Sequence, residues 1–323
     1  MLTSVAAVVA GLALLVWSAD RFVLGASATA RDLGVSPLII GLVIVGFATS
    51  SPEMLVASFA AWQGNPGLGI GNAVGSNIAN IALILGAAAL MRPLISASRI
   101  LTRELPLLMM VTVLAVALML GGTLGRFEGM IMLASLGVAL WLLLREALDQ
   151  RDTASDPLAA ELTEQIPAGM PLRRAIGWLV VGFVLLLVSS RMLVWGGINI
   201  AAALGVSDLV IGLTIVAVGT SLPELAAAIA SALKDEHDLV LGNVIGSNLF
   251  NTLAVLGLPA LIHPARIPPE VLTRDLPVMC AVTLLLIPVL LHRPGRRGRI
   301  GRLEGLLLVS CFVAYEGYLF ATL

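Results

Sequence analysis

Apolar stretches long enough to cross a lipid bilayer recur along the whole chain, separated by short polar segments. About 20 apolar residues span the hydrocarbon core as a helix, so each stretch predicts one transmembrane helix. Ten helices are predicted, at 2–19, 36–61, 69–90, 105–121, 127–144, 175–192, 208–232, 239–262, 276–291 and 303–322. We expect the first and sixth to continue to about residues 30 and 203. The fold class predicted is an all-α polytopic membrane protein.

One longer polar stretch divides the chain into five segments plus five. We expect one transmembrane domain over 1–323, with a first repeat at 1–144, a linker loop at 145–174 and a second repeat at 175–323. Loops on the cytoplasmic side are enriched in Lys and Arg. With the N-terminus outside, 15 of the 19 basic residues fall in cytoplasmic loops, and the exceptions are Arg126, Arg191, Arg266 and Arg274. This predicts a cell (inner) membrane protein with both termini outside and the linker in the cytoplasm.

The two halves repeat the same polar motifs 171 residues apart. "GNAVGSNIAN" from Gly71 returns as "GNVIGSNLFN" from Gly242, and "TSSPE" at 49–53 returns as "TSLPE" at 220–224. "TRELP" at 102–106 returns as "TRDLP" at 273–277, while "GRFEG" at 125–129 returns as "GRLEG" at 301–305, at an offset of 176. Since each half holds an odd number of segments, the second half enters the membrane from the opposite side. Two inverted five-helix repeats are predicted, an architecture that recurs among secondary transporters.

The composition narrows the range of functions. The chain is 59% hydrophobic and 12% charged, whereas a soluble domain carries about 25% charged residues. Its 19 basic and 20 acidic residues leave no basic face for nucleic acid, so the lipid bilayer is the expected partner and no obligate protein partner is evident. Cys280 and Cys311 lie in apolar runs, where a thiol is usually a small hydrophobe. No phosphate-binding loop supports ATP-driven pumping, and no cofactor is expected.

Two glutamates lie well inside apolar segments at equivalent positions, Glu53 and Glu224. A charge at the centre of a transmembrane helix costs about 2.5–3.5 kcal/mol on insertion scales, so such carboxylates usually face an interior cavity and serve function. A protonated Glu bonded to a neighbouring helix is the plain structural alternative. Two symmetric copies in polar surroundings favour function.

Oxygen-bearing residues precede each glutamate by one helical turn. Thr49 and Ser50 share a helical face with Glu53, and Thr220 and Ser221 stand in the same relation to Glu224. Pro52 and Pro223 are expected to break each helix by leaving carbonyls without a donor. Such broken helices occur at membrane depth where they line a cavity, and their free carbonyls can coordinate cations.

A second polar stripe explains the repeated ten-residue motif. Its side chains recur every fourth residue, at Asn72, Ser76 and Asn80 in the first half and at Asn243, Ser247 and Asn251 in the second. Gly71, Gly75, Gly242 and Gly246 form GxxxG spacings that permit close helix approach. We expect this helix to lie against the glutamate helix. Carboxylate, hydroxyl, amide and carbonyl oxygens suit Ca²⁺ or Na⁺, and no His or Cys lies within these motifs.

The segments "GFATSSPEMLVASFAAWQGNPGLGIGNAVGSNIANIALILG" from Gly46 and "AVGTSLPELAAAIASALKDEHDLVLGNVIGSNLFNTLAVLG" from Ala217 resemble the alpha-repeats of the calcium/cation antiporter superfamily, prokaryotic sodium/calcium exchanger type. The resemblance implies that its first and sixth helices slide across the other eight. It also implies one set of cation ligands: carboxylates of Glu53 and Glu224; backbone carbonyls of Thr49, Thr220, Gly46 and Ala217; hydroxyls of Ser50, Ser76, Ser221 and Ser247; and, around the centre, Asn80 and Asn251. Relatives often carry Asp at the position of Asn251, so we expect weaker proton competition here.

Together these features predict a transport domain and not an enzyme: a secondary antiporter that exchanges Na⁺ for Ca²⁺ by alternating access. Ca²⁺ and Na⁺ are then transported substrates. Coupling to H⁺ or K⁺, or transport of another divalent cation, is the nearest alternative. A cation channel with two glutamates in its filter is the alternative outside the transporter class. An intramembrane enzyme is disfavoured because no metal triad, nucleotide loop or Asp-rich diphosphate motif supports it.

Overall fold

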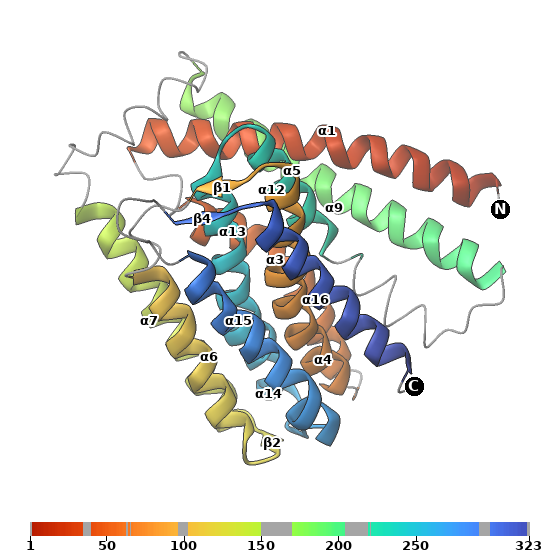
Figure 1. Ribbon diagram of the computed structural model, residues 1–323, viewed down its shortest axis with the longest axis vertical. Helices are drawn as coiled ribbons and strands as arrows, with labels where there is room; N and C mark the ends of the chain where they lie inside the picture. The colour runs from red at the N-terminus through yellow and green to blue at the C-terminus, as the bar shows by residue number, and fades with distance from the viewer. Residues whose placement is uncertain are drawn as a thin grey trace.

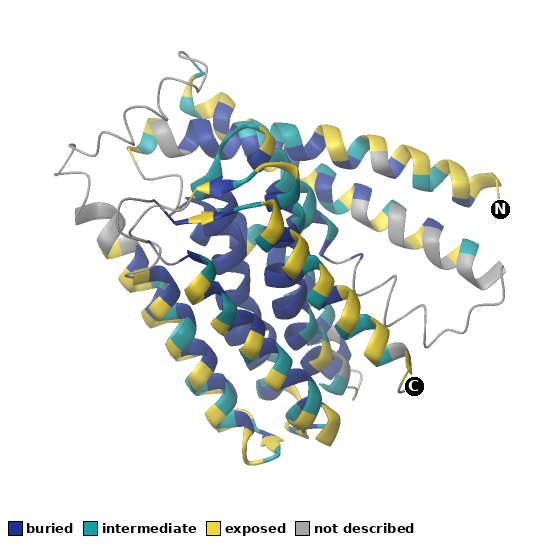
Figure 2. Ribbon diagram, viewed as in Figure 1, coloured by how far each residue is buried: buried dark blue, intermediate teal, exposed yellow. Residues whose placement is uncertain are grey.

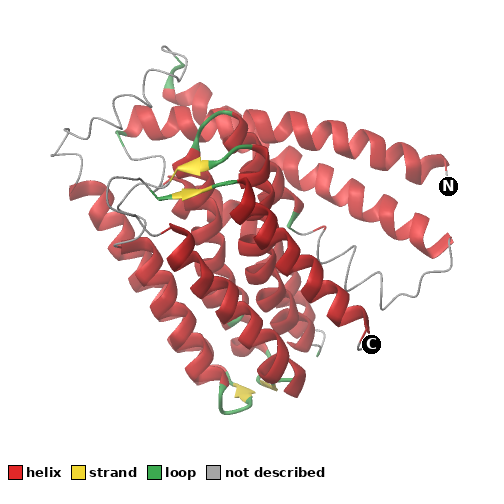
Figure 3. Ribbon diagram, in the orientation of Figure 1, coloured by secondary structure: helices red, strands yellow, loops and turns green. Residues whose placement is uncertain are grey.

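The computed structural model describes residues 2–34, 40–62, 64, 66–95, 103–149, 170–203, 219, 221–290 and 298–321. Most of these residues are helical, and one pair of long helices projects away from the remaining bundle (Figures 1 and 3). The α-helices are α1 (Leu2–Leu33), α3 (Gly46–Trp62), α4 (Pro66–Ile78), α5 (Gly86–Met91), α6 (Leu105–Met119), α7 (Arg126–Asp149), α9 (Leu172–Ala203), α12 (Leu222–Leu233), α13 (His237–Phe250), α14 (Gly257–Ile262), α15 (Leu276–Leu290) and α16 (Arg302–Ala321).

Several of these helices are joined end to end by short, wider π-helical segments. These are η1 (Ile40–Val45), η2 (Ala79–Leu85), η6 (Asn251–Val255) and η7 (Val271–Asp275). Because η2 links α4 to α5 and η6 links α13 to α14, residues 66–91 and 237–262 each form one long helix. The sequence predicts neither the π-helical widening nor its positions.

Each of the ten predicted segments contains helix in the part of the chain that is described. The first and sixth are single helices that run to Leu33 and Ala203, as expected. Of the segment predicted at 208–232, residues 208–218 and 220 lie outside the described residues. Among the described helical stretches, seven are long and apolar enough to cross a membrane, while α6 and α12 are shorter apolar helices.

Two short β-ribbons display the relation between the repeats. β1 (Leu94–Ile95) pairs antiparallel with β4 (Arg299–Ile300), and β2 (Thr123–Leu124) pairs antiparallel with β3 (Ala265–Arg266). The repeat offsets of 171 and 176 carry β1 onto β3 and β2 onto β4, so the two ribbons interchange, and their registers match. Figure 1 shows β1 and β4 near one end of the bundle and β2 at the other. The repeats are therefore inverted relative to each other.

Glycines at two helix crossings also correspond to each other between the repeats. A Cβ atom on Gly305 of α16 would lie 2.8 Å from the carbonyl oxygen of Gly86 in α5. A Cβ atom on Gly129 of α7 would lie 2.8 Å from the carbonyl oxygen of Gly257 in α14. The offsets carry Gly86 onto Gly257 and Gly129 onto Gly305. Both crossings bring backbone against backbone, which only glycine permits.

The most buried helices lie at the centre of the bundle (Figure 2). Every residue of α13 from Leu239 to Phe250 is buried, as is all of η6. The outer helices expose large apolar side chains, among them Met110, Phe127, Trp141, Leu303 and Val313. An apolar outer surface around a core that holds polar residues is what a lipid environment requires.

The long helices α1 and α9 pack along each other. A Cβ atom on Gly182 of α9 would lie 2.6 Å from the backbone nitrogen of Phe22 in α1, so the two backbones are in close contact. The rings of Phe22 and Phe183 lie 6.3 Å apart, and Trp17 meets Trp178 edge to face at 6.2 Å. Lys234, which follows α12, reaches α1 and places its Nζ atom 2.8 Å from Oδ1 of Asp20. These two helices form a pair at one side of the core.

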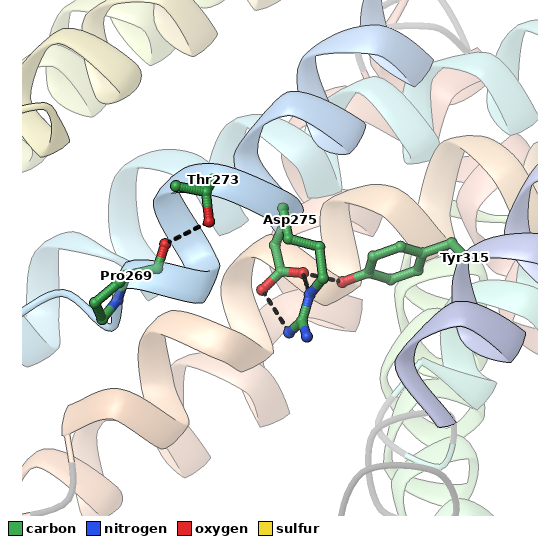
Figure 4. Close-up of polar contacts among 5 residues, drawn as sticks. Pro269, Thr273, Asp275 and Tyr315 are labelled. Carbon is green, nitrogen blue, oxygen red and sulfur yellow. Dashed lines mark hydrogen bonds and ion pairs between the residues drawn. The ribbon is translucent and has the colours of Figure 1, made fainter. Parts of the chain in front are cut away.

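The "TRDLP" motif fixes the start of α15 to α16 (Figure 4). Nε of Arg274 donates to Oδ1 of Asp275 at 2.7 Å, and the hydroxyl of Tyr315 in α16 donates to the same oxygen at 3.0 Å. The Thr273 hydroxyl donates to the carbonyl oxygen of Pro269 at 3.0 Å. Asp275 is 7% exposed, and its counterpart Glu104 is 1% exposed. Both repeats therefore bury an acidic side chain at this position of the motif.

Candidate cation-binding site

The two predicted glutamates come from different repeats and are both buried. Glu53 lies in α3 and is 1% exposed, and Glu224 lies in the first turn of α12 and is 2% exposed. The carboxyl group of Glu224 interacts electrostatically with Glu53 and also with the side chain of Thr49. Two carboxylates that are near enough to interact repel each other when both are ionised. The pair therefore favours a bound cation or protons.

The helices around Pro52 and Pro223 differ from the expectation that a proline breaks the helix in each repeat. α3 runs without a break through Pro52, and the irregular backbone lies earlier, in η1. The prediction of a break at Pro52 is therefore wrong: the surrounding bundle holds the helix together despite the missing donor. In the second repeat α12 begins at Leu222, so Pro223 stands in its first turn, where the absent N–H is no loss. Glu224 then lies near the positive end of the helix dipole.

Thr49 is the point where α3 meets α13. Its hydroxyl donates to the carbonyl oxygen of Val45 at 3.0 Å, which anchors it to its own helix. The same Oγ1 atom lies 3.3 Å from Oδ1 of Asn243 and 3.3 Å from the hydroxyl of Ser247. The second polar stripe thus lies against the glutamate helix, as expected.

Glycines allow this approach on the α13 side. A Cβ atom on Gly46 would lie 3.0 Å from the carbonyl carbon of Gly246 and 3.0 Å from the nitrogen of Ser247. The expected close packing is therefore present at Gly246. Near Gly71 and Gly75 no described atom lies within 4 Å of an added Cβ. Gly246 packs against the backbone of Leu42. The position in the second repeat that is equivalent to Leu42 is residue 213, which lies outside the described residues.

Most of the other predicted ligands are buried side chains. Five of them are buried with exposed fractions of 5% or less: Ser50, Ser76, Asn80, Ser221 and Asn251. The hydroxyl of Ser50 and both amide atoms of Asn251 have no hydrogen-bond partner within the described part of the chain. Thr220 and Ala217 lie outside the described residues. Asn251 opens η6, and Asn80 is the second residue of η2; π-helical turns are frequent at functional sites.

Three polar residues that the sequence reasoning did not assign connect the two central helices. Nδ2 of Asn80 donates to Oδ1 of Asn248 at 3.0 Å. Nδ2 of Asn77 donates to the hydroxyl of Thr252 at 3.0 Å. Asn77 and Asn248 are equivalent and identical positions of the repeated motif, which was the available signal. Their one-residue offset from the every-fourth-residue stripe concealed them.

Comparison with known proteins identifies the family. The model of the family described as "Sodium/calcium exchanger protein" matches residues 3–145 and 174–321. The chain belongs to the sodium/calcium exchanger family. It is 32% identical over 343 residues to the sodium/calcium exchanger MaX1 of Methanosarcina acetivorans, with 96% of each chain covered. It is 40% identical over 322 residues to the inner membrane protein YrbG of Escherichia coli, covering 99% of this chain and 98% of that protein.

Among solved structures, the sodium-calcium exchanger NCX_Mj, soaked with Na⁺ and Sr²⁺, superposes with a TM-score of 0.84 at 29% identity and covers 98% of each chain. The exchanger described here is accordingly an all-α polytopic membrane protein with ten transmembrane helices in two inverted five-helix repeats, and the predicted fold class is confirmed. Its family is one of cation antiporters that include calcium exchangers.

Proposed function

We propose that this exchanger couples Na⁺ entry to Ca²⁺ export, by alternating access at one site that both repeats build. The observation that carries the proposal is the pair Glu53 and Glu224, one from each repeat, buried to 1% and 2% exposure and near enough for their carboxyl groups to interact electrostatically. The proposed ligands are the twelve residues that the resemblance implies, with the two carboxylates at the centre. The relatives named as sodium/calcium exchangers support the choice of ions.

Charge balance explains how the two ions would exchange at such a site. Two carboxylates neutralise one Ca²⁺ or two Na⁺, and neutral hydroxyl, amide and carbonyl oxygens complete either coordination shell. An empty site leaves two buried carboxylates facing each other, which is costly without cations or protons. Occupation by one kind of ion therefore excludes the other. This competition couples the opposing fluxes when access alternates between the two sides.

The pair α1 and α9 is the proposed moving element. The two helices contact each other closely along their lengths. In the most apolar 18-residue stretch of each, only 29% of the residues of α1 and 22% of those of α9 are buried. The corresponding 18-residue stretch of the central helix His237–Ile262 is wholly buried. The outer helix α7 is buried to the same 22%, so what distinguishes α1 and α9 is that they pack chiefly on each other, and such a pair can shift as a unit against a fixed core. Sliding of α1 and α9 would then change which side reaches the site.

We also propose the orientation in the cell membrane. The end of the bundle that holds β1 and β4 carries Arg92, Arg299 and Arg302, while the end that holds β2 and β3 carries Arg126 and Arg266. Together with the charge count over all loops, this favours a cytoplasmic β1–β4 end, with both termini outside and the 145–174 segment as a cytoplasmic linker. Single cysteines in place of Gly121 and Arg299, in a protein whose free Cys280 and Cys311 are replaced by Ser, test it. A membrane-impermeant thiol reagent should label only the first in intact cells.

Transport of ⁴⁵Ca²⁺ into proteoliposomes tests the function. Vesicles loaded with Na⁺ are diluted into Na⁺-free, K⁺ or pH-jump buffers. Uptake should require the outward Na⁺ gradient and should vanish in Glu53→Gln and in Glu224→Gln. Glu316→Gln is the matched control, because Glu316 is a partly buried carboxylate of α16 outside the proposed site. Uptake that follows a proton or K⁺ gradient instead would overturn the coupling ion. Undiminished uptake in either site variant would overturn the site.

A further inference from the structure

Asn80 holds a defined orientation in the central helices. It donates its Nδ2 hydrogen to Oδ1 of Asn248 across the interface between η2 and α13, at 3.0 Å. Its own Oδ1 atom is buried and accepts no hydrogen bond in the described part of the chain. Both residues are 1% exposed, so no solvent competes for this bond. The amide of Asn80 is therefore held by its nitrogen on Asn248, and its oxygen can still accept a hydrogen bond or bind a cation.

The equivalent pair in the other repeat is not formed. The offset of 171 carries Asn80 onto Asn251 and relates Asn248 to Asn77. Exact symmetry would have Nδ2 of Asn251 donate to Oδ1 of Asn77. Within the described residues, both amide atoms of Asn251 and Oδ1 of Asn77 lack a partner. Asn77 instead donates Nδ2 to Thr252 Oγ1 at 3.0 Å and lies 3.5 Å from Sδ of Met279.

A sequence difference at Thr252, which makes the shorter of the two contacts of Asn77 Nδ2, accounts for the asymmetry. Thr252 follows Asn251 in η6 and is 1% exposed. Its counterpart in the first repeat is Ile81, whose side chain has no hydroxyl group. The hydroxyl of Thr252 accepts from Nδ2 of Asn77 and so fixes how that amide is turned, and in this orientation Oδ1 of Asn77 receives no hydrogen bond from Asn251. The two asparagines are identical in type and equivalent in position, but only one is held.

We propose that Thr252 is a positioning residue that gives the two asparagines different tasks. The inference rests on the proposed function, in which Asn80 and Asn251 are cation ligands. Asn80 is then a ligand fixed in advance, whereas Asn251 turns its amide as Ca²⁺ and Na⁺ replace each other. A ligand that keeps its rotational freedom binds less tightly than a fixed one, because ordering it on binding has an entropic cost. It also releases the ion faster.

Replacing the hydroxyl of Thr252 tests this assignment. Thr252→Val removes the acceptor while nearly preserving shape, so the Asn77 amide is no longer held and can turn its Oδ1 atom toward Nδ2 of Asn251. Thr252→Ser keeps the hydroxyl and is the conservative control. We expect Thr252→Val to lower the KM for Ca²⁺ and the kcat together, each roughly two- to tenfold, which is the range set by immobilising one side chain. Thr252→Ser should match the wild type. ⁴⁵Ca²⁺ uptake by Na⁺-loaded proteoliposomes gives both constants.

A double-variant cycle with Asn77→Leu shows whether Thr252 acts through Asn77. On that background Thr252→Val should have no further effect on KM. A KM for Thr252→Val that equals that of the wild type, or that rises, overturns the assignment. So does a fall in kcat at constant KM, since a packing defect would produce that. If the cycle variant does not fold, the comparison of Val with Ser still decides.

Asn251→Ala separates failure of this inference from failure of the proposed function. Impaired Ca²⁺ uptake in Asn251→Ala with unaltered kinetics in Thr252→Val would refute only the role of Thr252. Unimpaired uptake in Asn251→Ala would remove Asn251 from the proposed ligand set, and the role of Thr252 with it. Elution of every variant as a single peak from size-exclusion chromatography controls for folding.

Discussion

The two glycine crossings give the sharpest test of the packing between repeats. Gly129→Ala would place a Cβ atom 2.8 Å from the carbonyl oxygen of Gly257 and 3.1 Å from Cβ of Ala260. Gly305→Ala would place one 2.8 Å from the carbonyl oxygen of Gly86 and 3.1 Å from Cβ of Ala89. The obstructing atoms are backbone or Cβ atoms, which cannot rotate away. Each helix pair must therefore separate to accept the methyl group.

The magnitude follows from two opposing effects. Overpacking a dense interface costs about 1–3 kcal/mol, while Gly to Ala in a helix gains up to about 1 kcal/mol. Gly137→Ala in α7 and Gly317→Ala in α16 are matched controls, because no described atom lies within 4 Å of an added Cβ at either position. The helix-propensity gain applies equally at the crossing and control positions and cancels, so the crossing variants should be less stable than the controls on the same helices by roughly 1–3 kcal/mol.

Thermal unfolding in detergent, followed by loss of the monodisperse peak, measures the difference. We expect Gly129→Ala and Gly305→Ala each to melt at least about 2 °C below the control on the same helix, with both controls at or above the wild type. The double variant should lose about the sum of the two, because the crossings share no residues. Equal melting temperatures for Gly129→Ala and Gly137→Ala would refute the close crossing. So would a large effect at only one of the two equivalent positions.

Two further predictions concern charge. Asn251→Asp would add a third carboxyl group to the proposed site of Glu53 and Glu224, where like charges would raise its affinity for protons. Ca²⁺ uptake should then fall between pH 8 and pH 6 by about threefold more than in the wild type, and parallel pH profiles would contradict the reasoning. Burial raises the pKa of Glu236, at the start of α13, above its ordinary value, and the Ser27 hydroxyl and Lys234 offset only part of this. Ionised Glu236 therefore destabilises the fold at pH values above that ordinary pKa. Glu236→Gln should raise the melting temperature at pH 8 and leave it unchanged near pH 4. A higher melting temperature at pH 4 alone would contradict this direction of the pKa change.

The architecture could be predicted because its signals are local. Segment length and apolar content identify each helix, and the motif offset of 171 residues identifies the two repeats. The odd number of segments in each half then fixes the inversion. The β-ribbons could not be predicted in this way, because β1 and β4 are two residues each and meet across 204 to 206 positions of sequence. Pairing at such separation depends on how the whole bundle closes.

The site was predictable as far as helical spacing reaches. Glu53, Thr49 and the stripe of Asn243 and Ser247 follow from residues one turn apart, and the structure brings Thr49 against that stripe. Contacts between helices are set by crossing geometry, which no spacing within one helix reveals. The bond between Asn77 and Thr252 is of this kind. So is the continuity of α3 through Pro52, which tertiary packing maintains against local preference.

Competition between the two ions at equilibrium tests the central claim most directly. Binding of ⁴⁵Ca²⁺ to the purified protein in Na⁺-free detergent is measured while Na⁺ is added, for the wild type, Glu53→Gln, Glu224→Gln and the control Glu316→Gln. One site built by both repeats predicts that Na⁺ displaces Ca²⁺ completely from the wild type and the control, and that each site variant loses Ca²⁺ binding. Full Ca²⁺ binding by either site variant, or Ca²⁺ that Na⁺ does not displace, would contradict a shared site.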